Sequence, residues 1–230
     1  MTDGVPVRLT GWALILGASS GFGEATSLAL ARAGMNIFGV HLDRKATLAE
    51  RGETGRVRVL VHSLAFGTLK PFLSDPVQDS VTPAQMDMTL DVMAHTLVYW
   101  TQELVARGLM REGGRIYAMT SSGGARVLPF YGPVSAAKAA LESHIRQLAL
   151  ELAPHSITAN AIRAGVTHTP ALQKIPGHEA IVASAQRRNP SGRLTTPEDV
   201  ARAIVVLAHP DTHWITGNVI GVDGGEEVVG

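Results

Sequence analysis

The stretch that decides the fold is Leu16–Gly23, L-G-A-S-S-G-F-G, which follows an apolar run and precedes a series of small residues. The run Trp12–Leu16 has the length and composition of a short buried strand. Residues 23–34 favour a helix of small side chains. A glycine-rich turn between a strand and a helix is the setting in which this motif binds a dinucleotide, so we expect a nucleotide-binding βαβ unit.

The glycines of this turn have different expected roles. Gly17 permits the tight turn, Gly21 lets the backbone approach a pyrophosphate, and Gly23 lets the helix pack closely on the strand. The helix N-terminus offers free N–H groups and a partial positive charge to phosphates. A turn that needs glycine only for its geometry is the alternative. The residues expected to contact the cofactor here are Gly17, Ser19, Ser20, Gly21, Phe22 and Gly23.

Strand and helix patterns alternate along the rest of the chain, as in successive βαβ units. The further expected strands are 36–40, 56–61, 115–119, 157–162 and 218–222. The further expected helices are 82–108, 136–153 and 197–208. Residues 170–193 carry prolines, glycines and weak periodicity, which predicts a lid loop with some helix. We predict an α/β fold with a single Rossmann-like, doubly wound parallel sheet, in one domain spanning residues 1–230.

Composition supports this class of fold and argues against several partners. Hydrophobic residues make up 45% of the chain and aromatics only 5%, which is typical of the aliphatic core of a parallel sheet covered by helices. Lysine plus arginine and aspartate plus glutamate number 20 each, so no net field attracts nucleic acid or an acidic membrane. The polar start and the lack of a long apolar run predict a cytoplasmic protein without membrane partners.

Neither cysteine nor histidine chemistry predicts a metal centre. The chain has no cysteine, which excludes disulfides, thiolate catalysis and zinc–thiolate sites. Its nine histidines form no HExxH motif. His209 and His213 are four residues apart, but Pro210 breaks the helix that would align them. We therefore expect no metal site.

Tyr131 and Lys138 form the most informative polar pair, in F-Y-G-P-V-S-A-A-K, with six residues between them. A phenol with its ordinary pKa of about 10 donates a proton poorly at neutral pH unless a nearby cation lowers that pKa. Lys138 supplies such a cation. A packing tyrosine near a helix start and a lysine on a solvated helix face are the alternatives, and both weaken because the pair accompanies a nucleotide turn.

Several motifs together resemble the short-chain dehydrogenase/reductase family over nearly the whole chain. They are G-A-S-S-G-F-G, N-P-S-G-R-L-T-T-P-E-D-V-A and I-T-G-N-V-I-G-V-D-G-G. Within this family, R-V-L-P-F-Y-x6-K-A-A-L-E and V-H-S-L-A-F-G resemble the bacterial enoyl-acyl-carrier-protein reductases. The common short-chain dehydrogenases place the phenol four residues before the lysine, where this chain has Val134. The displaced phenol implies a displaced acceptor oxygen and a different substrate.

The resemblance implies hydride transfer from a reduced nicotinamide to the β-carbon of a 2-enoyl thioester. Tyr131 would hydrogen-bond the thioester oxygen as an enolate forms, and Lys138 would also grip the nicotinamide ribose. Ser122 falls near the family's usual active-site serine, and Ser121 falls where many enoyl reductases have a second tyrosine. Two turn serines at a strand end are the alternative. Met93 stands where family members commonly carry an asparagine that supports a water relay to the lysine.

Two other segments are expected to hold the cofactor by resemblance. Gly165, Thr167 and Thr169 in A-G-V-T-H-T resemble the turn that holds the nicotinamide amide and phosphates, with a plain strand-to-loop turn as the alternative. The strand end V-H-S-L-A-F-G adds Ser63, Leu64 and Ala65.

Cofactor choice rests on the end of the second strand, V-H-L-D-R-K. His41 stands where NAD-preferring relatives often carry aspartate, which binds the ribose hydroxyls. Arg44 and its basic neighbour favour NADPH slightly, while Asp43 keeps NADH open. A solvated charge cluster is the alternative.

The chain is short between its second and third strands. The family normally has another helix–strand–helix unit there, and residues 42–55 are too few for it. In the family's strand numbering the expected order is therefore 2-1-4-5-6-7, with strand 3 absent. Either the domain has a shortened sheet or the sequence omits a stretch of the native chain.

Three functions stay open. The preferred one is NAD(P)H-dependent enoyl-thioester reduction in fatty acid synthesis, with acyl carrier protein as a transient partner and a homo-oligomer, a dimer or tetramer, as the assembly. A ketone or alcohol oxidoreductase of the same family, using Ser122 with Tyr131, is the nearest alternative. A non-catalytic dinucleotide-binding homologue is the third.

Overall fold

The computed structural model describes residues 7–40 and 56–229. Within them, six parallel strands form one sheet in the order β2-β1-β3-β4-β5-β6. This is the order expected from the sequence, with β2 at an edge. The strands are β1 Trp12–Leu16, β2 Asn36–Val40, β3 Val57–His62, β4 Arg115–Thr120, β5 Thr158–Ala164 and β6 Val219–Val222.

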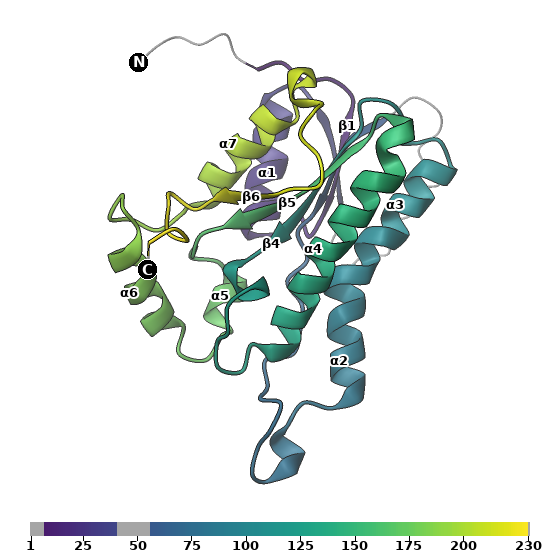
Figure 1. The fold of residues 1–230 in the computed structure, drawn as a ribbon. Coiled ribbons are helices and arrows are strands. Elements are labelled where there is room, and N and C mark those ends of the chain that lie inside the picture. The colour runs from purple at the N-terminus through teal and green to yellow at the C-terminus, as the bar shows by residue number, and fades with distance from the viewer. Residues whose placement is uncertain (1–6, 41–55, 230) are drawn as a thin grey trace.

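Helices cover both faces of the sheet, which gives the three layers of a doubly wound fold (Figure 1). The helices are α1 Gly21–Arg32, α2 Pro83–Leu90, α3 Thr96–Ala106, α4 Gly132–Leu152, α5 Pro170–Gln173, α6 His178–Arg188 and α7 Pro197–Leu207. Single turns lie at η2 Val77–Asp79, η4 Ser122–Gly124, η5 Ala153–His155 and η6 Pro210–Thr212.

The alternating side chains of the strands divide the core into two halves. Leu14 and Leu16 point to the face that α3 and α4 cover, where they pack with Leu97 and Leu141. Ala13 and Ile15 point to the opposite face, which α1 and α7 cover. Because consecutive residues of a strand face opposite sides, a short apolar strand such as β1 is buried on both faces.

The long helix expected over residues 82–108 is interrupted in the structure. Between α2 and α3 the chain makes a π-helical turn, η3, at Asp91–His95. The Thr96 hydroxyl donates to the Val92 carbonyl oxygen at 2.7 Å, and Nε2 of the buried His62 lies 2.8 Å from the same hydroxyl. The interruption therefore lies where the helix crosses the end of β3, a contact between distant segments that helical periodicity does not report.

Other boundaries also differ from the prediction. Helix α4 begins at Gly132, four residues earlier than expected, so Tyr131 is its N-cap residue. Proline in its first turn suits a helix start. Helix α1 begins at Gly21, two residues early. Strand β5 continues to Ala164, which brings the chain directly to the next turn.

The segment predicted as a lid contains two helices, α5 and α6 (Figure 1). The chain after β6 approaches α6, where the Glu226 carboxylate lies 3.3 Å from the Arg188 guanidinium. No helix in the described part of the chain is long and apolar enough to cross a membrane.

Candidate active site

A cavity opens at the carboxyl ends of β3, β4 and β5, between the start of α4 and the α5–α6 segment. This is the edge at which doubly wound folds bind ligands. Its lining includes these residues predicted from the sequence: Phe22, Ser63, Leu64, Ala65, Ser121, Ser122, Tyr131, Lys138, Gly165, Thr167 and Thr169. Segments far apart in the chain thus meet in one pocket.

The glycines of the nucleotide turn are required by close backbone contacts. Gly17 has a positive φ of 88°, and a Cβ there would lie 2.4 Å from the Ser63 carbonyl oxygen. A Cβ on Gly23 would lie 2.1 Å from the Gly17 carbonyl oxygen. Gly21 has a φ of 56°, and a Cβ there would be in van der Waals contact with the Thr169 side chain. Side chains larger than hydrogen are therefore excluded at Gly17 and Gly23 by sterics, which supports the roles predicted for them.

The start of α1 has the features of an anion-binding site. Ser20 is the N-cap residue, but its side chain makes no capping hydrogen bond. The first N–H groups of a helix need acceptors, and they carry a partial positive charge. Because Phe22 from this first turn lines the cavity, the first N–H groups of α1 lie near it. Together with the glycine contacts, this cradle fits the pyrophosphate of a dinucleotide.

Lys138 projects from α4 into the floor of the site. Its Nζ donates to the Met119 carbonyl oxygen at 2.6 Å, and the residue is buried. Burial lowers the pKa of Lys138 to about 8, because desolvation penalises the ammonium, while the Glu142 carboxylate acts in the opposite direction. That carboxylate also accepts a hydrogen bond from the Thr120 hydroxyl at 2.7 Å. The alternative of a lysine on a solvated helix face is therefore wrong.

Tyr131 lies at the N-terminus of α4, against the turn after β4. A Cβ on Gly123 would be 2.4 Å from Cε1 of the phenol ring, so the ring lies directly on this glycine. The phenol oxygen is 3.4 Å from the Ser121 hydroxyl. Desolvation raises the pKa of the Tyr131 phenol, and the contact with Ser121 lowers it by less. The preceding Phe130 has a φ of 62°, a strained conformation for a bulky side chain that commonly accompanies functional sites.

Apolar side chains lie beside Tyr131, on the side of the pocket that η3 forms. Met93 of η3 packs with Val134 and Ala137, and Tyr131 contacts this cluster. Val134 lines the cavity at the position where the common short-chain dehydrogenases have their phenol. Met93 also lines the cavity. The site therefore presents one phenol, from Tyr131, with a thioether and a branched alkyl group beside it.

The turn after β5 is held by close contacts from behind. A Cβ on Gly165 would lie 2.4 Å from the Thr195 hydroxyl. The Thr167 hydroxyl donates to the Gly165 carbonyl oxygen at 2.9 Å. The Thr169 hydroxyl accepts from the Leu172 N–H at 3.2 Å and so caps α5. These contacts fix the path of the chain from β5 into α5.

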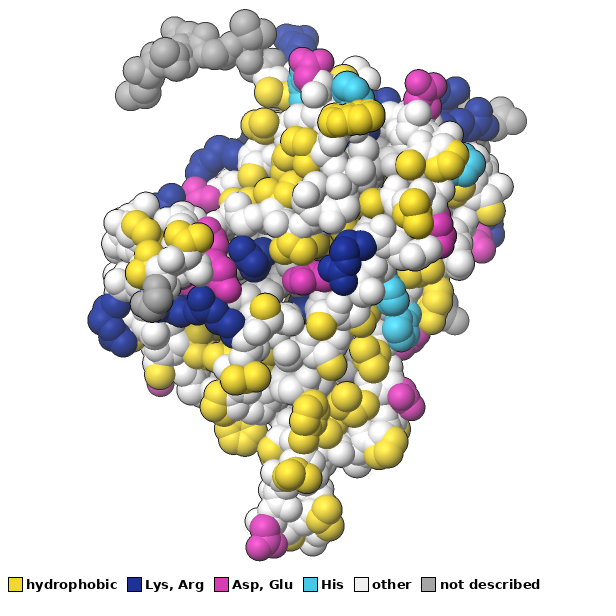
Figure 2. Space-filling view, viewed as in Figure 1, with side chains coloured by type: hydrophobic (Ala, Val, Ile, Leu, Met, Phe, Trp, Pro, Cys, Tyr) yellow, Lys and Arg dark blue, Asp and Glu magenta, His cyan; other side chains and the backbone are white. Residues whose placement is uncertain are grey.

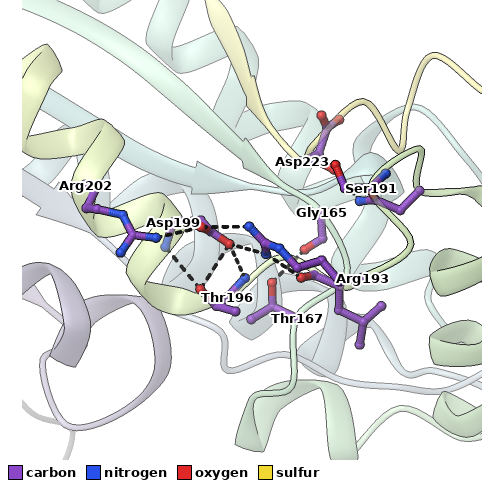
Figure 3. A network of polar contacts seen from close by, with 10 residues as sticks. Gly165, Thr167, Ser191, Arg193, Thr196, Asp199, Arg202 and Asp223 are labelled. Carbon is purple, nitrogen blue, oxygen red and sulfur yellow. Dashed lines mark hydrogen bonds and ion pairs between the residues drawn. The ribbon is translucent and has the colours of Figure 1, made fainter. Parts of the chain in front are cut away.

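Behind this turn lies a charged network at the start of α7 (Figure 3). The Asp199 carboxylate accepts from the guanidinium groups of Arg193 and Arg202 at 2.7 and 2.8 Å, and from the Thr196 N–H at 2.9 Å. Hydrogen bonds from Arg193 hold the pKa of Asp199 well below its ordinary value, despite some burial. The motif N-P-S-G-R-L-T-T-P-E-D thus supports the turn after β5 from behind.

The structure places most of the other predicted site residues beside the cavity, and its lining also includes residues that were not predicted. His41 and Arg44 lie outside the described residues. Gly17, Ser19, Ser20, Gly21 and Gly23 form the turn beside the cavity. Sequence reasoning missed residues of the lining whose only signal was their place next to a motif: Thr120, Gly123, Leu128, Val166, Leu172, Lys174, Ile175 and Ile181. It also missed Thr195, which touches the Gly165 turn from a distant segment.

Comparisons with known proteins agree with this geometry. Residues 45–227 match the family described as Enoyl-(Acyl carrier protein) reductase. The NADH-dependent enoyl-[acyl-carrier-protein] reductase FabI of Nostoc sp. is 34% identical over 180 residues, which cover 78% of this chain and 68% of that protein. FabI of Aquifex aeolicus is 33% identical over 178 residues, which cover 76% of this chain and 64% of that protein, less than two thirds of its length.

The fold gives the same result. A crystal structure of the Aquifex aeolicus enoyl-[acyl-carrier-protein] reductase superposes with a TM-score of 0.82 and 26% identity, covering 98% of this chain and 99% of that one. The family match spans the phenol–lysine pair and the ends of β3, β4 and β5, and the superposed fold extends over 98% of the chain. The chain therefore belongs to the enoyl-(acyl carrier protein) reductase family.

Proposed function

We propose that the protein reduces the carbon–carbon double bond of a 2-enoyl thioester with a reduced nicotinamide dinucleotide. The observation that carries this proposal is the position of the Tyr131 phenol and the Lys138 ammonium. Both line one cavity at the carboxyl edge of the sheet, next to an uncapped helix start. Family membership supports the substrate class and the reaction type.

The bound cofactor would supply a hydride to the β-carbon of the substrate. Negative charge then develops on the thioester carbonyl oxygen as the enolate forms. The Tyr131 hydroxyl is the donor proposed for that oxygen, and its ring is held in place by Gly123. A donor fixed in advance at the oxygen stabilises the transition state more than the ground state.

Lys138 is the cation proposed to assist the phenol and to hold the cofactor. An ammonium has three N–H donors, and one of them is used by the Met119 carbonyl oxygen. The remaining two are available to the cavity, where we propose that they bind the ribose hydroxyls. Their positive charge favours the negative charge that develops on the substrate oxygen. The expectation that Lys138 lowers the pKa of the Tyr131 phenol is not supported, because burial raises that pKa and Ser121 is the group that acts against the rise.

The serines and the apolar cluster shape the proton supply. Ser121 is within 3.4 Å of the phenol oxygen, so we propose that it orients this group. Ser122 lines the cavity beside it and is the second proposed contact for the substrate. A thioether and a valine side chain cannot carry protons, so with Met93 and Val134 beside Tyr131 we propose that the enolate carbon receives its proton from Tyr131 or through the cavity mouth.

NADH is the cofactor that we propose. The two FabI relatives are named as NADH-dependent. The slight preference for NADPH expected from Arg44 is not supported by these relatives, and His41 and Arg44 fall outside the described residues. Gly165, Thr167 and Thr169 are proposed to hold the nicotinamide end.

The proposal extends to the segment over the cavity and to partners. Leu172, Ile175 and Ile181 of the α5–α6 region line the cavity, so we propose that this segment is a lid that covers the acyl chain. Acyl carrier protein is the proposed carrier of the thioester. A homo-oligomer, a dimer or tetramer, in the cytoplasm completes the proposal.

The test is an assay of crotonyl thioester reduction, followed as oxidation of NADH and then of NADPH. We expect Tyr131→Phe to lower kcat by about 10²-fold with little change in NADH affinity, because only a transition-state donor is lost. Tyr117→Phe is the matched control. Tyr117 is also a buried phenol, but it donates to the Leu207 carbonyl oxygen in the opposite half of the core.

Three results would contradict the proposal. Oxidation of neither cofactor would favour a non-catalytic homologue. Turnover of a ketone or alcohol in preference to the enoyl thioester would favour the other class of short-chain reductase. Equal losses in Tyr131→Phe and Tyr117→Phe would remove the catalytic role of Tyr131.

A further inference from the structure

The segment that follows β6, D-G-G-E-E at Asp223–Glu227, folds back toward the active site. Gly224 and Gly225 have φ values of 63° and 87°, a left-handed conformation that glycine adopts without strain. The Asn189 side-chain amide donates to the Asp223 carbonyl oxygen at 2.8 Å. These two features turn the chain after β6, so that the next two residues approach the cavity walls.

Glu226 is almost fully buried, with 4% of its surface exposed, and it joins two of these walls. Its Oε2 accepts from the Val166 N–H at 3.0 Å, in the turn that lines the cavity after β5. Its Oε1 accepts from the Arg188 guanidinium at 3.3 Å, at the last residue of α6. A Cβ on Gly165 would be 2.9 Å from the same carboxylate, so this glycine makes room for it.

Glu227 contacts a third part of the site, the loop between β4 and α4. Its carboxylate lies 3.0 Å from Arg126 Nε, and its carbonyl oxygen accepts from Arg126 Nη2 at 3.3 Å. Arg126 belongs to the loop between β4 and α4, which also carries Ser121 and Tyr131. Figure 2 shows acidic and basic side chains close to one another across the middle of the molecule.

We propose that Glu226 and Glu227 are positioning residues that fix three parts of the site relative to one another: the turn after β5, the end of α6, and the loop that carries Tyr131. We call this pair the C-terminal clasp. The inference rests on the proposed function, because it assigns the clasp a role in holding NADH and the lid in register with the phenol.

The physical argument is the cost of a buried carboxylate. Taking a carboxylate out of water is unfavourable unless charged and hydrogen-bonding partners replace the water. Glu226 has an N–H on one oxygen and a guanidinium on the other, each from a different segment. Its position is therefore well defined only when both segments are in place, so the clasp links the conformation of the lid to that of the cofactor turn.

The experiment compares NADH dissociation constants, read from nicotinamide fluorescence, with KM and kcat for crotonyl thioester. Glu226→Leu removes the acceptor of the Val166 N–H and the partner of Arg188, and we expect NADH affinity to fall about tenfold or more. Glu226→Gln keeps an acceptor oxygen and loses the charge, so we expect a smaller loss. In both variants kcat should change less than KM for NADH, because Tyr131 remains.

Charge reversal tests the contacts themselves. The pair Arg126→Glu with Glu227→Arg should restore NADH affinity that either single change lowers. The pair Arg188→Glu with Glu226→Arg should not, because the Val166 N–H still lacks an acceptor. Glu103→Gln is the matched control, since it breaks the exposed Glu103–Arg107 ion pair on α3. Melting curves identify any variant that fails to fold, and Glu226→Gln then carries the test.

The outcomes separate the two claims. A wild-type protein that binds NADH but reduces no enoyl thioester overturns the proposed function and leaves the binding test of the clasp intact. NADH affinity in folded Glu226→Leu and Glu226→Gln equal to that of Glu103→Gln overturns the clasp. The clasp is also overturned if the two charge-reversal pairs change kcat and KM for NADH by the same factor.

Discussion

The floor and the cover of the cavity are held by different forces. The floor comprises the end of β4, the following turn and the first two turns of α4, and its polar contacts are buried, as in the Lys138 bond to the Met119 carbonyl oxygen. The cover comprises α5, α6 and the C-terminal clasp. Its contacts are ion pairs whose arginines are partly exposed, with the Arg126 and Arg188 side chains 39% and 30% exposed, while the Glu226 carboxylate is buried.

This difference suits the floor to catalysis and the cover to control of substrate entry. The buried floor holds charged and polar groups in fixed positions, which suits stabilisation of a transition state. The Arg126–Glu227 pair of the cover is partly exposed, and such pairs are individually weak and sensitive to salt, which suits the proposed lid.

The largest effect is expected from removal of the floor's ammonium. Lys138→Met should lower kcat/KM by about 10²- to 10³-fold, because a preorganised charge near the reacting oxygen is lost. The free energy of unfolding should not fall, because burial of this ammonium is unfavourable, as its pKa of about 8 indicates. Steady-state kinetics and urea unfolding measure the two quantities. Loss of folding in Lys138→Met would show that the lysine is chiefly structural.

A smaller effect is expected from acid, through the buried His62 beneath the floor. Desolvation and then the charge of Lys138 lower the pKa of His62 to about 3. The unfolded chain therefore binds a proton below pH 6.5 that the folded protein does not, and stability falls as the pH is lowered toward 3. We expect about 2 kcal/mol of loss between pH 7 and pH 5 from this residue.

The measurement is urea unfolding at several pH values in the wild type and in His62→Gln. Glutamine keeps an amide N–H for the Thr96 hydroxyl, and it does not titrate. The wild-type protein should lose more stability in acid than this variant. Parallel pH profiles would mean that His62 is protonated in the folded protein.

The smallest effect is expected from salt, and it should fall on the cover alone. Raising the ionic strength from about 0.1 M to about 1 M shortens the Debye length from roughly 10 Å to 3 Å. Because partly exposed ion pairs contribute only about 1 kcal/mol or less, KM for NADH should rise about two- to threefold. The variant with both Arg126→Gln and Glu227→Gln should show less of this rise. A salt-dependent kcat with unchanged KM would instead place the screened charge in the floor.

The strand order followed from the resemblance to the short-chain dehydrogenase/reductase family. The sequence by itself predicted the strands, the glycine-rich turn and the phenol–lysine pair. These depend on local patterns, namely apolar runs of strand length, glycines between a strand and a helix, and a phenol and a lysine at fixed spacing on one helix start. Ser63, Ser121 and Gly165 are expected at one site by resemblance to the family, and a parallel sheet brings the carboxyl ends of its strands to one edge.

Only the tertiary structure decided the groups that reach the site across long sequence separations. The π-turn at Asp91–His95 meets His62 of β3, and Glu226 meets Val166 and Arg188. Helical periodicity and motif spacing describe neighbours along the chain, whereas these contacts depend on which segments the packed sheet and helices bring together. The burial that shifts the pKa of Lys138 has the same origin, because desolvation is a property of the assembled core.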